Sequence, residues 1–201
     1  MPDVSPTVSP TKSFRDLLRT ATAEAHLSLE SRLDILSRLS ERVARLETMI
    51  RFRTMHAAAE ERLAPIVGAL DGLAYSQRRK TGLLDADIRV LGGSAAASPP
   101  HSLFTVRSKG EALGLLYVLE GSTLGGRMIF REMQGRGISS EGLSFFDAYG
   151  SDTGLKWREF LVVLEREAER GGAEMRDEIV SGAISAFRQI EAWLCGEAVA
   201  A

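Results

Sequence analysis

Apolar residues recur at helical spacing along almost the whole chain, and no segment alternates apolar and polar residues as a half-buried β-strand does. We therefore expect an all-α protein. The first periodic segment opens with Ser13 and Asp16, spaced as in a capping box. The face that follows carries the apolar residues Phe14, Leu18, Ala21, Ala25, Leu29 and Leu36. This pattern predicts a helix that ends near Asp34.

The next two helices are predicted from a cap, a proline and the same spacing. Ser40 is the predicted N-cap of a long helix, which should end near Pro65 because proline cannot continue the backbone hydrogen bonding. Its apolar positions include Val43, Leu46, Ile50, Ala57 and Leu63. A shorter helix is predicted over 77–90.

A loop and a glycine-containing helix come next. Segment 92–102 is rich in Gly, Ser and Pro, which predicts a loop. Ser108 is then the predicted cap of a helix that contains LYVLEGSTLGGRMIF, residues 116–130, and Gly135 and Gly137 should end it.

The last part of the chain is predicted to hold two helices. A connection with an aromatic pair, Phe145 and Phe146, leads to helices over 153–169 and 173–195. We find no internal repeat and no domain linker, so the pattern predicts one bundle of six or seven helices.

The length and composition agree with one globular domain. A chain of 201 residues is long enough to bury about 70% of its unfolded surface around a single core. We assign residues 13–197 to that domain and expect residues 1–12, rich in Pro, Ser and Thr, to be a disordered tail. A net charge of −2 gives no electrostatic footprint for nucleic acid, so we expect no nucleic-acid partner.

The cysteine count and the apolar runs indicate a cytoplasmic protein. The single cysteine, Cys195, excludes an intrachain disulfide and a cysteine-based zinc site, and it suits a reducing compartment. No apolar run approaches the roughly 18 to 20 residues that span a bilayer. The first residues also lack the pattern of a targeting signal. We therefore expect no association with a membrane.

Three glycines stand inside the predicted helix over 116–130. Gly121, Gly125 and Gly126 together cost about 3 kcal/mol of helix propensity relative to alanine. Because Gly121 and Gly125 lie four residues apart, they share one face of the helix and leave its backbone bare. This spacing is open to two interpretations, close packing of a second helix or contact with a flat ligand. Phosphate-binding and dinucleotide-binding loops are excluded, because neither a GK[ST] sequence nor a preceding strand is present.

Histidines are the candidates for metal binding or acid–base chemistry. His26 and His56 each have a glutamate four residues on, Glu30 and Glu60, which could accept the second ring N–H and so orient the imidazole. An exposed or core histidine with an incidental helix pair is the alternative for both. His101 stands in the loop and is assigned no role.

His26 is favoured as a ligand by its neighbours. It flanks the apolar positions Ala25 and Leu29, and Arg19 lies two turns earlier on the same helix face, where it could pair with the acid groups of a bound ligand. Arg19 could equally be a solvated surface residue. A di-iron site is excluded because the chain contains no ExxH motif, and Cys195 near the chain end is read as an inert thiol.

Taken together, these segments resemble the haem oxygenase family, in particular its bacterial, biliverdin-producing members. LLRTATAEAHLSLE is similar to the proximal helix of that family, and LGLLYVLEGSTLGG is similar to the distal helix. RFRTMHAAAEERLAPI and FFDAYGSDTGLKWREF also resemble bacterial members, so the similarity runs from about Ser13 to the last helix. The residues that match the family motifs are Thr22, His26 and Glu30, and Gly121, Gly125 and Gly126.

The resemblance implies an enzyme that opens haem to biliverdin, ferrous iron and CO, with O2 and electrons from a separate reductase or ferredoxin. The haem carries the chemistry and the protein supplies its position. The resemblance also implies that a bilin acceptor, such as a bacterial phytochrome, could take the product.

The resemblance further assigns roles to single residues. His26 would be the axial ligand of the iron with Glu30 as its partner, and the three glycines would lie over the porphyrin. Arg19 matches a basic residue that pairs with a haem propionate, and Thr22 and Tyr117 lie on the same two helices.

Two positions depart from the animal enzymes. Ser122 stands where animal members have an aspartate that organises waters beside the iron-bound ligand, so the network must be built otherwise here. His56 falls where animal enzymes have a tyrosine facing that network.

Two rival functions stay open at this stage. A non-catalytic protein of the same fold could bind haem or a bilin, and a purely structural bundle could use the glycines for helix packing.

Overall fold

The computed structural model describes residues 13–94 and 103–196, and over these ranges the backbone forms helices and no strand. The all-α expectation is confirmed. Seven α-helices are present in this part of the chain: α1 (Phe14–Leu33), α2 (Ile35–Ser40), α3 (Arg42–Val67), α4 (Thr81–Val90), α5 (Lys109–Gly135), α6 (Thr153–Arg170) and α7 (Gly172–Cys195). Three 3₁₀ helices join them: η1 (Tyr75–Arg78), η2 (Ser144–Asp147) and η3 (Gly150–Asp152). Across the described ranges, no helix is both long and apolar enough to cross a membrane.

The predicted start and end of the first helix are confirmed. The Ser13 hydroxyl accepts a hydrogen bond from the Asp16 backbone N–H at 3.2 Å, which caps α1. Asp34 then takes a left-handed conformation with a φ of 40° and ends the helix. Leu36 lies beyond this break and belongs to the short helix α2, which the periodicity did not separate from α1.

The cap predicted at Ser40 is wrong. Its hydroxyl donates to the Leu36 carbonyl at 2.7 Å in the last turn of α2, and α3 begins two residues later, after Glu41. The predicted end at Pro65 is also early by two residues. Pro65 occupies the last turn of α3, and the helix runs on to Val67, with the Gly68 N–H bonded to the Ala64 carbonyl.

The helix predicted over 77–90 is split in two. Residues Tyr75–Arg78 form η1, Arg79 is extended, and α4 starts at Thr81. Glu60 of α3 causes this start, because its carboxylate accepts the backbone N–H groups of Lys80 at 2.6 Å and Thr81 at 2.9 Å.

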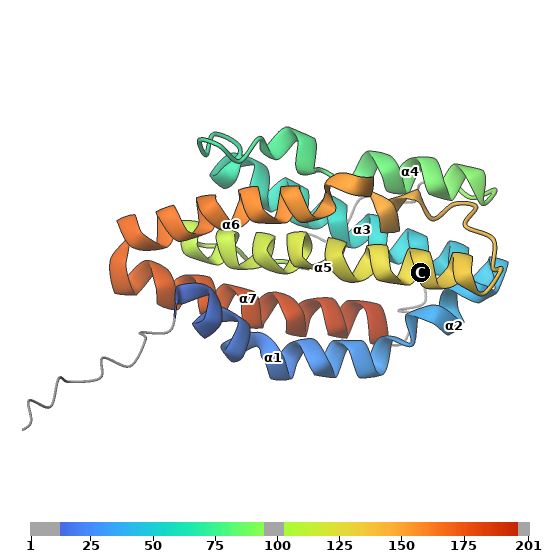
Figure 1. Ribbon diagram of the computed structural model, residues 1–201, viewed down its shortest axis with the longest axis horizontal. Coiled ribbons are helices and arrows are strands. Elements are labelled where there is room, and N and C mark those ends of the chain that lie inside the picture. The colour runs from blue at the N-terminus through green and yellow to red at the C-terminus, as the bar shows by residue number, and fades with distance from the viewer. Residues whose placement is uncertain (1–12, 95–102, 197–201) are drawn as a thin grey trace, which may run out of the picture.

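The core is built around α5 and α7, which lie side by side through the middle of the molecule (Figure 1). Helix α1 packs along α7, α6 lies against α5 and α7, and α3 with α4 covers another side of α5. One hydrophobic cluster fills the space between α1, α3, α5, α6 and α7, and a second lies between α2, α3, α4, η2 and the last turns of α5. The predicted tail 1–12, His101 and most of the predicted loop fall outside the described residues.

Candidate functional site

Helix α5 begins with glycines that are packed tightly. A Cβ on Gly114 would collide with the Ile179 carbonyl oxygen of α7 and lie 2.5 Å from the Ala183 nitrogen. A Cβ on Gly182 of α7 would lie 2.7 Å from the Cα of Glu111. The backbones of α5 and α7 approach each other closely here because neither helix carries side chains at the crossing.

The three glycines singled out in the sequence behave differently. A Cβ on Gly125 would meet nothing within 4 Å, and one on Gly121 would only touch the Trp157 ring at 3.6 Å, an ordinary contact. Gly126 is tight, since its Cβ would lie 3.1 Å from the Phe146 carbonyl oxygen. Close helix packing is therefore wrong as an interpretation of Gly121 and Gly125, whose backbone stays accessible.

The polar and apolar residues beside these glycines are also exposed. Ser122 lies on the surface with its hydroxyl donating to the Leu119 carbonyl at 2.8 Å. Leu124 is 38% exposed and Met128 73% exposed, although both are large apolar residues. The middle of α5 thus presents bare backbone and apolar side chains to solvent, as a ligand-binding surface does.

His26 on α1 is paired as the sequence predicted. Its Nδ1 lies 3.5 Å from a carboxylate oxygen of Glu30, and its side chain is 53% exposed. The ring stands edge-on to Phe187 of α7, with centroids 5.4 Å apart and planes at 85°. With Nδ1 facing the carboxylate, Nε2 is the nitrogen available to a metal.

Contacts with α7 indicate that His26 and the bare part of α5 lie at the same height along the helix bundle. Helices α1, α5 and α7 run in the same direction (Figure 1). On α7, Gly182 packs against α5 near Glu111 and Gly114, and Phe187, five residues further on, touches His26. Five residues beyond Gly114 on α5 lead to position 119, next to the glycines.

A second contact, between α1 and α5, indicates the same alignment of His26 with the glycines. Burial raises the pKa of Tyr117 on α5, while a side-chain hydrogen bond with Thr22 and the charge of Arg19, both on α1, lower it. These three residues are therefore neighbours. One helical turn further along each helix come His26 on α1 and Gly121 on α5.

Arg19 is mostly exposed and pairs weakly with Asp16, its Nη2 lying 3.4 Å from a carboxylate oxygen. Thr22 is buried and donates to the Leu18 carbonyl at 2.9 Å. The cation of Arg19 is therefore free to turn toward a ligand, whereas Thr22 and Tyr117 form the fixed part of this end of the site.

His56 is buried against the turn that supports Gly126. Its ring contacts Phe145 with centroids 5.0 Å apart, and its Nε2 finds no hydrogen-bond partner among the described residues. Burial lowers the pKa of His56 to about 4, with the Glu60 charge opposing this and the Lys80 charge adding to it. His56 is therefore neutral near pH 7.

The role predicted for Glu60 is different in the structure. The sequence suggested that Glu60 orients His56, but its carboxylate bonds the N–H groups that open α4 and the Arg79 side chain at 2.9 Å. Burial would raise the pKa of Glu60, and these donors hold it below its ordinary value. Glu60 acts on His56 through its charge.

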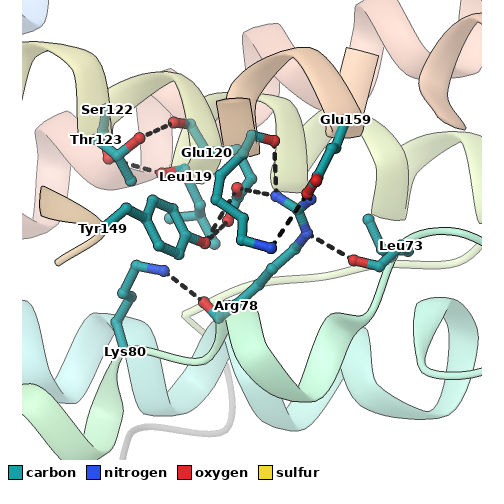
Figure 2. Close-up of polar contacts among 10 residues, drawn as sticks. Leu73, Arg78, Lys80, Leu119, Glu120, Ser122, Thr123, Tyr149 and Glu159 are labelled. Atoms are coloured by element: carbon teal, nitrogen blue, oxygen red, sulfur yellow. Dashed lines mark hydrogen bonds and ion pairs between the residues drawn. The ribbon is translucent and has the colours of Figure 1, made fainter. Parts of the chain in front are cut away.

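The sequence reasoning missed a buried ionic cluster behind the glycines (Figure 2). The Glu120 carboxylate accepts hydrogen bonds from Arg78 Nη1 at 2.5 Å and the Tyr149 hydroxyl at 2.9 Å. Lys80 Nζ lies 3.7 Å from the centroid of the Tyr149 ring and donates to the Arg78 carbonyl at 2.8 Å. Burial lowers the pKa of Lys80 to about 8, partly against the charge of Glu120. One signal was present in the sequence, a glutamate inside the apolar run LLYVLEG.

Comparison with known proteins identifies the family of this chain. The chain is 34% identical over 156 residues to a protein named heme oxygenase from Xanthomonas campestris pv. campestris (strain 8004), a match that covers 76% of this chain and 89% of that protein. The chain belongs to the haem oxygenase family. No family model matches it.

A solved structure supports the fold of the family. The structure is similar to the crystal structures of the NO- and CO-bound heme oxygenase from Neisseria meningitidis, with a TM-score of 0.71, 22% identity and coverage of 95% of this chain and 96% of that one. The resemblance to haem oxygenases, the helical fold and the expectation of a haem oxygenase enzyme are thereby confirmed. The roles of individual residues stay predictions.

The donor set fits haem iron better than a metal ion held by several side chains. Within residues 13–94 and 103–196, no group of three or more His, Cys, Asp or Glu residues could hold a metal ion. A half-exposed imidazole level with a bare helix is instead suited to a flat macrocycle, which needs one axial nitrogen and an unobstructed surface on its other face.

Proposed function

We propose that this chain binds haem between His26 of α1 and the glycine turn of α5, residues 121–126, and opens it to biliverdin, ferrous iron and CO. The family membership supports the reaction. The single observation that supports the place is a half-exposed imidazole at the same level as a helix surface on which Gly125 meets nothing within 4 Å. Bound haem would supply the oxygen chemistry, and the residues around it would control position and proton access.

His26 would hold the iron through Nε2. The Glu30 carboxylate, 3.5 Å from Nδ1, would accept its proton and so orient the ring toward the ligand. Phe187 supports the same orientation from α7 by its edge-on contact with the imidazole.

The glycine turn would allow the other face of the haem to approach the main chain. Gly121 and Gly125 place no side chain in the way, and the Ser122 hydroxyl, which donates to its own helix, can still accept a hydrogen bond. Ser122 stands where the animal enzymes carry an aspartate, so the waters that this aspartate organises would be held by other groups here.

The acid groups of haem would lie at the Arg19 end of the site. Arg19 provides an exposed cation, and the Tyr117 hydroxyl beside Thr22 provides a more buried polar group. Thr22 and Tyr117 lie one turn before His26 and Gly121, and Arg19 lies two turns before His26, so this end would set how far the ring enters the site.

His56 would support the water network on the glycine side. It lies behind the Phe145–Phe146 pair, on which Gly126 packs, and its Nε2 lacks a partner in the described part of the chain. A neutral imidazole can donate at one nitrogen and accept at the other, which suits proton exchange through water.

The remaining reactants follow from the reaction. We propose O2 as oxidant and a separate reductase or ferredoxin as electron donor. We further propose that the reaction takes place in the cytoplasm and that residues 13–197 form the single domain that performs it. A bilin acceptor such as a bacterial phytochrome is proposed for the product.

A haem titration followed by reduction in air tests this function. Wild type should shift the Soret band on binding, and the band should decay while a bilin band grows once electrons are supplied. His26→Ala should lose the axial ligand and the turnover, and His101→Ala serves as the matched control with wild-type behaviour. A Soret band that persists under reduction would indicate the non-catalytic carrier, and equal behaviour of wild type and His26→Ala would contradict the axial role.

A further inference from the structure

We propose that Arg78, Glu120 and Tyr149, here called the Glu120 clamp, fix the position of the glycine turn, so that Glu120 and Tyr149 are positioning residues for the reaction on its surface. The effect on haem depends on the proposed function, but the effect on the turn itself does not.

The clamp is attached directly to the turn. Glu120 immediately precedes Gly121, and its carboxylate is bonded on one side by Arg78 and on the other by the Tyr149 hydroxyl (Figure 2). The side chains of Arg78 and Glu120 are only 1% and 3% exposed. A buried, charge-assisted pair of this kind has a narrow geometry, so it restrains the rotation of α5 at position 120.

The partners of Glu120 are themselves fixed to other elements. Arg78 donates from Nε to the Leu73 carbonyl at 2.7 Å and from Nη1 to the Lys156 carbonyl at 3.1 Å. Tyr149 directly precedes η3, and its ring makes a cation–π contact with Lys80. The clamp therefore joins α5 to η1 and α6, and a shift of the turn would have to break contacts with both.

The glycine turn needs such a restraint from behind. At 100° per residue, Glu120 and Gly125 point about 140° apart, so the clamp is on the inner side of α5 and the open backbone is on the outer side. Three glycines weaken the helix here by about 3 kcal/mol of propensity. On the outer side, a Cβ on Gly121 would touch the Trp157 ring and one on Gly125 would meet nothing within 4 Å, whereas Gly126 packs on Phe146.

Amide hydrogen exchange on the haem-free chain tests the restraint. Tyr149→Phe removes one hydrogen bond to a carboxylate and keeps the ring under Lys80, so the variant should fold. We expect the amides of residues 121–126 to exchange about tenfold faster, because a hydrogen bond to a charged group is lost next to them.

Tyr75→Phe is the matched control. Its hydroxyl is buried in the same region but has no hydrogen-bond partner in the described part of the chain, so its removal should leave the exchange of 121–126 unchanged. Equal exchange in Tyr149→Phe and wild type, or the same acceleration in α7 as in the turn, would overturn the proposal.

The haem complex gives a second readout besides turnover. Tyr149→Phe should shift the C–O stretching frequency of the ferrous CO complex, because the backbone dipoles over the ligand would move, while Tyr75→Phe should not. An unchanged frequency in Tyr149→Phe would contradict positioning of the turn. If wild type shows no Soret shift with haem, the proposed function fails, and the exchange experiment still decides the clamp.

Discussion

The two halves of α5 contain the same motif and use it in opposite ways. Gly110 and Gly114 form one GxxxG sequence, and Gly121 and Gly125 form another, which begins eleven residues after the first. The first pair packs against α7, Gly114 against its backbone and Gly110 against the Glu178 side chain, and the second pair lies largely open. Spacing alone shows that a helix face lacks side chains, but what covers that face is decided by the neighbouring helices.

The largest effect on stability is expected from a substitution in the packed first half of α5. Gly114→Ala places a Cβ against the Ile179 carbonyl and the Ala183 nitrogen, which are backbone atoms and cannot turn aside. We expect a loss of about 3 kcal/mol in the free energy of unfolding, measured by urea denaturation, despite the better helix propensity of alanine. A stability equal to wild type would show that α5 and α7 can separate at no cost.

The next largest effect is the pH dependence of stability caused by His56, which is buried near the second half of α5. The pKa of His56 is lowered to about 4 in the folded chain, against an ordinary value of 6.5, so the unfolded chain binds the proton more tightly. Stability should therefore fall as the pH drops from about 6.5 toward 4, by about 2 kcal/mol at pH 5. His56→Gln should remove this part of the pH dependence when urea unfolding is compared at pH 7 and pH 5. An identical loss in both proteins would mean that His56 is not buried in its neutral form.

The smallest effect is a gain in stability, opposite to the loss expected for Gly114→Ala. Gly125→Ala adds a Cβ where nothing lies within 4 Å, so the haem-free chain should gain about 1 kcal/mol of stability from helix propensity. The same change should slow haem turnover, because the added methyl group lies on the proposed ligand surface. Destabilisation of the haem-free chain would place Gly125 in a packed environment and remove the contrast between the two halves.

Much of the fold could be predicted because local signals are strong in this chain. The caps at Ser13 and Ser108 are formed as expected, the latter through the Glu111 N–H at 3.2 Å, and α5 ends at Gly135. The errors fall where a tertiary contact replaces a local one. Glu60 starts α4 from a different helix, and no pattern within 77–90 could show this.

The candidate site was predictable to a similar extent. The pairing of His26 with Glu30 follows from helical spacing, and the structure reproduces it at 3.5 Å. Glu120 was overlooked, because a glutamate in an apolar run is understood only once Arg78 and Tyr149, 42 and 29 residues away along the chain, are seen beside it.

By itself, the sequence determined the helices, their apolar faces and the motifs shared with haem oxygenases, since these depend on neighbours three or four residues apart. The tertiary structure alone decided which glycine pair is covered by α7, which carboxylate is buried, and that His26 stands level with bare backbone. The physical reason is that a helix fixes the direction of each side chain, while the partner it meets is set by packing between distant segments.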